Sequence, residues 1–367
     1  MRGIEVIGIY LIYILIVYGI VRNSYRRNQC VCDKRKILCV EIIFIAGLSV
    51  LLNVIFTNIG IITGSDRLNY IYEFSGARAP DSLGLQWIFS LVHTLGGDIY
   101  TVYNMTTFIT VFLTLYAYKK SKYANEKVIL LLLSTQWVFY TFTALKQSYA
   151  NAFAALAFVK IIEGEKRKDY LWGSFFIVLA ILFHSSAVIL VPITILIIIN
   201  ETPSKKSSII SAFVIIGSLF IQKIAILFAK IINPFLPMVA AKISQYMTDF
   251  GASGVYSLAV LKYVAVFVIL LWAILNRNRY INTIEGYTKY EMVTLFSAIL
   301  LLYSVISYWF VRFIDMLYFP VFVFYVLIDK ETMLSGNRNL IRCIVYGSQF
   351  FFTFRWILRI FNIYGGL

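Results

Sequence analysis

The chain has 367 residues, of which 60% are hydrophobic and 14% charged, and its formal net charge is +15. A soluble domain carries roughly 25% charged residues, so this composition excludes an ordinary soluble protein. Apolar runs near the 20-residue spanning length recur along the chain and predict an all-α, polytopic membrane helical bundle, because helices satisfy their own backbone groups in lipid. The runs are too long and too uniformly apolar to be barrel strands.

We expect one integral membrane domain over residues 1–367 with about 11–12 transmembrane segments. In chain order, the expected spans outside residues 170–200 cover 4–21, 37–57, 99–118, 128–144, 147–162, 208–231, 257–276, 290–309, 312–328 and 340–360. The first is interpreted as a retained span rather than a signal peptide, because it lacks a small-residue cleavage site.

Basic residues set the expected orientation. The connection after the first span carries six Arg and Lys residues between Arg22 and Lys36 against Asp33 alone, which places it in the cytosol and the N-terminus outside. The basic connections at Lys119–Lys127 and Lys166–Lys168 then also fall inside. The positive charge is explained by topology and by anionic membrane lipids, so no nucleic-acid partner is expected.

The longest apolar run, residues 170–200, contains His184 followed by two serines. One straight helix would be about 46 Å long, whereas the hydrocarbon core is about 30 Å thick. A turn at His184-Ser185-Ser186 also returns more of the later basic residues to the cytosol. We therefore favour a broken hairpin over a single helix, which brings His184 to the outer half of the membrane.

Two longer segments, 57–98 and 232–257, are expected outside. The stretch "LGLQWIFSLVHTL" in the first resembles an amphipathic helix on the membrane surface, and its His93 is expected to be structural. Ionisable residues at membrane depth cost roughly 2.5–3.5 kcal/mol each, so those that persist are functional candidates. On this topology they gather on the outer side: Asp66, Arg67, Lys146 with Gln147, His184, Arg312 with Asp315, and Arg355 with Arg359.

Several cations with few acids and one histidine suit a substrate that carries phosphate or diphosphate. A histidine can accept a proton from an attacking hydroxyl. Simpler interpretations stay open: a local Arg312–Asp315 ion pair, arginines at 355 and 359 that reach outer headgroups, and a structural His184. A metal cluster is not apparent, and no cofactor is expected.

Three motifs then resemble the EpsG family. They are "GSDRLNYIYEF" from Gly64, "ALKQSYANAFAALAFVKIIEGEKRKDYLWGSFFIVLAILFHSSAVILVPI" from Ala144, and "FVRFIDMLYF" from Phe310. The central block is the most specific. The chain departs from the family pattern at Lys146, where arginine is expected, and lysine lacks the bidentate fork of arginine.

The resemblance implies a Wzy-like polymerase of bacterial surface polysaccharide (O-antigen, capsule or exopolysaccharide) with a GT-C-like membrane fold. Such an enzyme transfers a glycan from undecaprenyl diphosphate to the non-reducing-end sugar of a lipid-linked repeat unit, at the outer face of the bacterial cytoplasmic membrane. Its partners would be undecaprenyl-diphosphate-linked oligosaccharides, membrane lipids, and a chain-length regulator and flippase of the same pathway.

The residues take these roles as hypotheses. His184 is the base for the acceptor hydroxyl or orients it, and Asp66 is the alternative base. The expected substrate-binding residues are Arg67, Tyr70, Lys146, Gln147, Arg312, Asp315, Tyr318 and Arg355. The alternatives are an O-antigen ligase or another lipid-linked glycosyltransferase, and a polysaccharide flippase or transporter, for which internal repeat symmetry would be expected.

Overall fold

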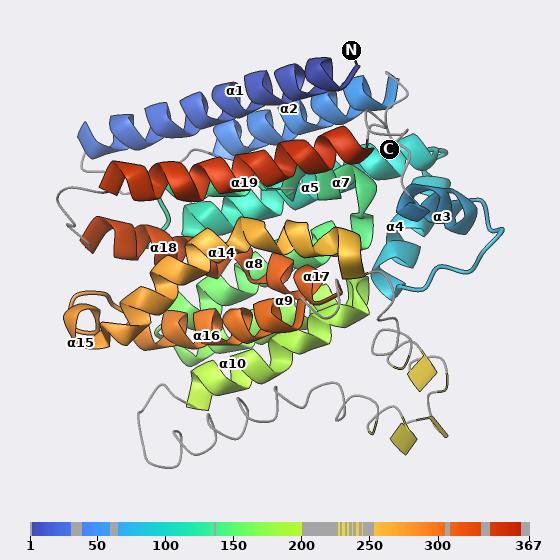
Figure 1. The fold of residues 1–367 in the computed structure, drawn as a ribbon. Coiled ribbons are helices and arrows are strands. Elements are labelled where there is room, and N and C mark those ends of the chain that lie inside the picture. The colour runs from blue at the N-terminus through green and yellow to red at the C-terminus, as the bar shows by residue number, and fades with distance from the viewer. Residues whose placement is uncertain are drawn as a thin grey trace.

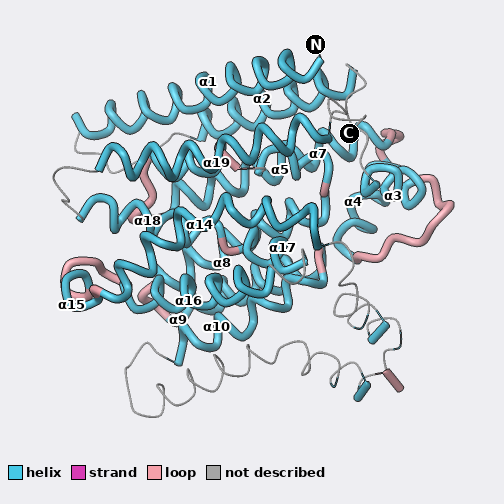
Figure 2. Tube along the Cα trace, viewed as in Figure 1, coloured by secondary structure: helices cyan, strands magenta, loops and turns pink. Residues whose placement is uncertain are grey.

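The computed structural model describes residues 2–30, 39–58, 65–135, 137–199, 253–304, 309–331 and 338–360, with isolated positions between 227 and 244. Helices make up almost all of this described chain, as Figure 2 shows, and the predicted all-α membrane bundle is confirmed. The helices of the N-terminal half are α1 (Arg2–Cys30), α2 (Cys39–Asn58), α3 (Ser65–Phe74), α4 (Leu83–Thr94), α5 (Ile99–Lys120), α6 (Glu126–Leu133), α7 (Trp137–Thr143) and α8 (Leu145–Glu163). The later ones are α9 (Arg167–Phe183), the 3-10 helix η1 (Ser185–Ile189), α10 (Leu190–Ile199), α14 (Ser253–Leu275), α15 (Arg277–Tyr280), α16 (Tyr287–Ser304), α17 (Trp309–Met316), α18 (Tyr318–Glu331) and α19 (Arg338–Ile360).

Three of the described helices are long and apolar enough to cross a membrane, and they lie at Glu5–Arg26, Cys39–Asn58 and Ile99–Lys120. Two shorter apolar helices follow at Ser185–Ile198 and Tyr263–Leu275. The expected span 208–231 and the expected outer segment 232–257 lie almost wholly outside the described residues. Each other predicted span overlaps a described helix, although two of those spans are interrupted, and the helices α3, α4 and α15 lie between the predicted spans.

Helix α8 forms the centre of the bundle. Its alanines are buried on several sides, and it packs against α5, α9, α10, α17 and α18. Small residues allow this close approach: a Cβ added at Gly173 of α9 would lie 2.4 Å from Cγ1 of Ile161 on α8. At 1.5 Å per residue the 19 residues of α8 extend about 28 Å, which is close to the thickness of the hydrocarbon core.

The run predicted as one span over 128–144 is broken between α6 and α7, and residue 317 separates α17 from α18 in the run 312–328. The first break frees backbone carbonyls that need donors. Two distant hydroxyls supply them: Tyr10 of α1 donates to the Leu133 carbonyl, and Thr353 of α19 donates to the Ser134 carbonyl, each at 2.7 Å. The break therefore depends on tertiary contacts that no local pattern reveals.

One end of the bundle is rich in ion pairs between connections. Lys122 after α5 pairs with Glu165 after α8 and lies 4.0 Å from Glu285 before α16. Asp329 of α18 accepts from Lys127 at 2.8 Å and from Arg342 at 2.7 Å. These are the basic connections that we expect in the cytosol, and the structure gathers them at one end.

The long apolar run 170–200 is broken at His184, as predicted. Helix α9 ends at Phe183, His184 is extended (φ −144°, ψ 112°), and η1 begins at Ser185. Figure 1 shows α10 running back from this break toward the end of the bundle at which α15 lies.

The opposite end carries α3 and α4, and α1 begins and α19 ends there (Figure 1). Gly84 lets α4 approach this end of α9, since a Cβ at this position would lie 2.6 Å from the Phe183 ring. His93 of α4 bonds the Phe74 carbonyl at 3.0 Å and stacks on the Phe74 ring at 4.0 Å, so its role is structural, as expected. Leu83, Trp87 and Leu91 of α4 are exposed, which fits the expected surface helix.

Candidate functional site

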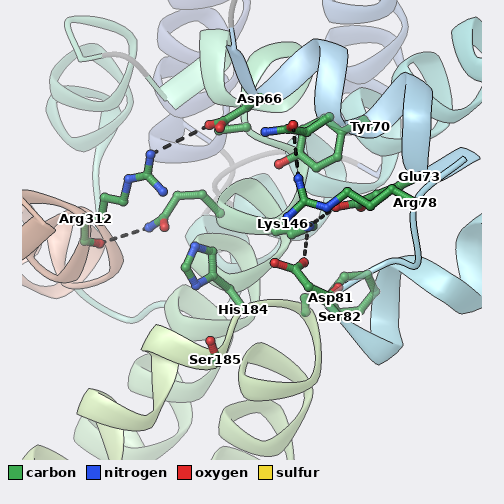
Figure 3. Close-up of a pocket in the computed structure, with 14 residues that line it drawn as sticks. Asp66, Tyr70, Glu73, Arg78, Asp81, Ser82, Lys146, His184, Ser185 and Arg312 are labelled. Carbon is green, nitrogen blue, oxygen red and sulfur yellow. Dashed lines mark hydrogen bonds and ion pairs between the residues drawn. The ribbon is translucent and has the colours of Figure 1, made fainter. Parts of the chain in front are cut away.

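An open pocket of about 320 Å³ lies between α3, the α3–α4 loop, the start of α8, the α9–η1 junction and α17. Figure 3 shows its charged side chains converging from these separate segments. The lining residues are Asp66, Asn69, Tyr70, Glu73, Arg78, Asp81, Ser82, Ala144, Lys146, Gln147, Phe183, His184, Ser185 and Arg312. Six of the ten residues predicted for the site are therefore brought together: Asp66, Tyr70, Lys146, Gln147, His184 and Arg312.

Lys146, on the first turn of α8, is held by two carboxylates. Its Nζ donates to Glu73 Oε1 at 3.0 Å and to Asp81 Oδ1, and it lies 5.2 Å from the ring centroid of Tyr70. The side chain of Glu73 is 2% exposed, that of Lys146 14% and that of Asp81 35%. Burial raises the pKa of the Glu73 carboxyl above its usual range, and the Lys146 ammonium opposes that shift.

Arg312 of α17 approaches the pocket from the other side. Its Nη2 lies 3.7 Å from Oδ2 of Asp66, so the two form an ion pair across the chain. Its backbone carbonyl accepts from Nε2 of Gln147 at 2.9 Å. This hydrogen bond links α17 to the start of α8, and it therefore helps to fix Arg312 relative to Lys146.

His184 enters the pocket because α9 ends there. Its amide donates to the Ala180 carbonyl at 2.9 Å and closes α9. Its Nδ1 accepts from the Ser186 backbone N–H at 3.2 Å, so the His184 side chain caps η1. The same nitrogen lies 2.5 Å from the Ser186 Oγ. Figure 3 shows the ring between Lys146 and the Arg312 side of the pocket.

Four predicted residues do not line this pocket. Arg67 is buried between α3 and α5, with Cζ 4.4 Å from the Tyr103 ring centroid, and its Nη2 lies 3.5 Å from Thr57 Oγ1. Asp315 is buried and accepts from the hydroxyls of Tyr140 and Tyr263, each at 2.6 Å.

Tyr318 is buried, with its ring 5.0 Å from that of Tyr263 and 5.4 Å from that of Phe322. Arg355 is exposed on α19. Tyr318 thus lies among core aromatic rings, and Arg355 lies on a helix that does not line the pocket. Asp315 fixes the position of α17, the helix that also carries Arg312.

A comparison with protein families now bears on this site. The EpsG family profile matches residues 48–364, which include every element that lines the pocket. The chain belongs to the EpsG family. This is a family of Wzy-like polysaccharide polymerases and EpsG transmembrane proteins, so the chain is a membrane protein with a polysaccharide-polymerase-like role. No curated protein and no solved structure matches it.

The sequence suggested a cluster of cations with few acids. In this EpsG chain the pocket is instead mixed in charge. Its lining includes three carboxylates, on Asp66, Glu73 and Asp81, beside three cations, on Arg78, Lys146 and Arg312. Charges this close to the membrane are stabilised by opposite charges, and the acids come from α3 and the loop after it. Among the described residues, no group of three or more His, Cys, Asp or Glu side chains has the arrangement of a metal site.

Glu73, Asp81 and Arg78 were not predicted from the sequence as site residues. One signal was present: Asp66, Tyr70 and Glu73 are spaced i, i+4 and i+7, so they share one face of a helix. The pairing of Asp81 with Lys146 spans 65 positions and has no local signature.

Proposed function

We propose that this EpsG-family chain is a surface-polysaccharide polymerase that acts on undecaprenyl-diphosphate-linked oligosaccharides at the outer face of the bacterial cytoplasmic membrane. It transfers the glycan of one lipid-linked chain to the non-reducing-end sugar of a lipid-linked repeat unit, on a GT-C-like multi-pass scaffold. The observation that carries the proposal is the single pocket in which Asp66, Lys146, His184 and Arg312 meet from four chain segments.

The proposed reaction breaks one bond and forms another. The acceptor hydroxyl oxygen bonds to the anomeric carbon of the donor glycan while the bond from that carbon to the diphosphate oxygen breaks. The electron pair stays on the diphosphate, where negative charge accumulates. Lys146, Arg312 and Arg78 are the pocket cations that stabilise this charge, an electrostatic effect that is strongest in a site with restricted water.

The ion pairs of the pocket are compatible with this role. Asp81 is 35% exposed and lies on a loop, so it can turn toward water when a diphosphate replaces it at Lys146. Glu73 is 2% exposed and stays against the lysine. When a diphosphate binds, Lys146 therefore replaces its Asp81 partner with phosphate oxygens. Its ion pair with Glu73 is kept throughout.

The orientation follows from α8. Lys146 and Gln147 at its first turn line the site, whereas Lys160 and Glu163 at its last turns line a second, lysine-rich pocket. About 28 Å separates the two ends of a 19-residue helix. The positive-inside rule favours the cytosol for the lysine-rich end, and this supports the proposal that the site lies at the outer face.

The test is extension of a defined undecaprenyl-diphosphate-linked repeat unit by the purified full chain in lipid nanodiscs. Lys146→Met is compared with Lys160→Met. Lys160 is a matched control because it is also paired with a carboxylate, Asp169 at 2.9 Å, but at the other end of α8. We expect ladders of products with wild type and Lys160→Met and a loss of at least about a hundredfold with Lys146→Met, the usual effect of removing one transition-state charge partner.

Other outcomes identify other functions. Transfer of one finished glycan to a lipid A core without ladders would make the chain a ligase. Movement of intact lipid-linked units between leaflets without new glycosidic bonds would make it a flippase. Either result, obtained with wild-type protein, overturns the proposal.

A further inference from the structure

The backbone at the α9–η1 junction fixes which nitrogen of His184 carries the proton. The Ser186 backbone N–H donates to Nδ1 at 3.2 Å, and a backbone amide can only donate. Nδ1 must therefore offer its lone pair, and the neutral ring bears its hydrogen on Nε2. The Ser186 hydroxyl, 2.5 Å from the same nitrogen, can rotate to donate as well.

This arrangement is the reverse of that in a histidine base. A base takes a proton on one ring nitrogen while the other, as N–H, donates to a carboxylate or carbonyl. At His184 the capping nitrogen accepts, and a proton on Nδ1 would face the amide proton of Ser186. Losing that bond and leaving the amide unpaired disfavours such a tautomer by about ten- to a hundredfold.

The pocket offers a better proton acceptor. Of its three carboxylates, Glu73 and Asp81 both accept hydrogen bonds from Lys146. Asp66 lies 3.7 Å from Arg312, beyond hydrogen-bond distance, and its side chain is 38% exposed. Its oxygens are therefore the carboxylate oxygens most open to an incoming hydroxyl.

We infer that His184 acts as a neutral Nε2–H donor to the diphosphate oxygens, and that Asp66 takes the proton of the acceptor hydroxyl. This inference rests on the proposed transfer reaction. The hydroxyl proton moves to Asp66 as its oxygen bonds to the anomeric carbon, and the departing diphosphate keeps the bonding electron pair. Ser186 is a positioning residue, since its N–H and hydroxyl hold the ring in the donor tautomer.

The first test reads the tautomer directly. The chain has two histidines, so ¹⁵N-histidine-labelled full chain carrying His93→Gln reports on His184 alone in long-range ¹H–¹⁵N correlation spectra. We expect an unprotonated Nδ1 and a protonated Nε2 at neutral pH. A protonated Nδ1, in a neutral or a cationic ring, overturns the inference, and this measurement does not depend on enzymatic activity.

The second test uses a matched pair of substitutions in the extension assay. His184→Gln places an amide N–H near the position of Nε2, whereas His184→Asn keeps an oxygen acceptor that can cap η1 but loses that donor. We expect His184→Gln to stay within about tenfold of wild type and His184→Asn to fall by about ten- to a hundredfold, the effect of one hydrogen bond to a charged group. Asp66→Asn should lose at least about a hundredfold, because general acid–base catalysis contributes about 10²–10⁴-fold.

Two results contradict the inference. A wild-type rate in His184→Asn would show that His184 only caps η1 and takes no part in the transfer reaction. Losses of about a thousandfold in both His184 variants, with Asp66→Asn close to wild type, would make His184 the base. If wild-type protein extends no chain at all, the proposed function fails, while the spectra still decide the tautomer.

Discussion

Replacing Lys146 with methionine should destabilise the protein as well as inactivate it, because the lysine neutralises a carboxylate that has almost no access to water. Glu73 is 2% exposed and has Oε1 3.0 Å from the Lys146 ammonium. Its other oxygen, Oε2, is buried and has no hydrogen-bond partner. Asp81, the second partner, is 35% exposed and can be hydrated once it is released.

The cost of Lys146→Met is therefore mostly that of an unpaired Glu73. Removing one partner of a buried ion pair costs about 3–5 kcal/mol, and the partial exposure of Lys146 and Asp81 reduces this to about 2–3 kcal/mol. Adding Glu73→Gln removes the stranded charge. The double variant should regain most of the free energy of unfolding but none of the polymer formation, since the cation is still missing.

The measurement is thermal unfolding of wild type, both single variants and the double variant in the same nanodiscs, with Lys160→Met as the control. Lys160 and Asp169 are 38% and 15% exposed, so that pair should contribute less than about 1 kcal/mol. The reasoning is wrong if Lys146→Met and Lys160→Met lower stability equally. It is also wrong if the effects of Lys146→Met and Glu73→Gln simply add.

The other predictions concern packing, support and pH. Gly84→Ala should lower the free energy of unfolding by about 1–3 kcal/mol and impair polymer formation through displacement of the Phe183 ring, whereas Gly47→Ala, which meets no atom within 4 Å, should be neutral or stabilising by thermal unfolding. Asp315→Ala should cost about 2–3 kcal/mol because two buried tyrosine hydroxyls lose their acceptor, and Asp315→Asn should cost less in chemical denaturation. Because burial raises the pKa of Glu73, the folded state holds its proton more tightly than the unfolded state does. Wild type should then lose stability relative to Glu73→Gln as pH rises above the ordinary glutamate pKa, and equal slopes of melting temperature against pH in the two proteins would contradict this.

The sequence predicted those features that depend on local pattern and on charge. Apolar length places the helices, and the break at His184 followed from a run too long for the bilayer, together with the basic residues on either side of it. Asp66, Lys146, His184 and Arg312 were candidates because charge at membrane depth is costly, and the structure brings all four to one pocket.

What the sequence could not predict depends on contacts between distant segments. The interruption at Ser134 is possible because Tyr10 and Thr353 donate to the freed carbonyls, and these donors lie more than a hundred residues away on either side. The acids opposite Lys146 were missed for the same reason, since periodicity along a helix does not show which loop will fold over it. The number of cations in the outer segments therefore overestimated the positive charge of the pocket.

The identity of the residue at the α9–η1 break links the local structure to the chemistry. A helix that begins inside the bundle needs a cap for its first amides, and serine, asparagine or aspartate would be the usual choice. Serine or aspartate would satisfy Ser186 but would place no further donor in the pocket, and asparagine would carry its amide N–H₂ nearer the backbone than Nε2 of histidine. Histidine caps through Nδ1 and keeps a second nitrogen, on the other side of the ring, as a donor. The same hydrogen bond that closes the break thus fixes the tautomer, so a substitution that strengthens the cap at position 184 should stabilise the fold and lower the rate together.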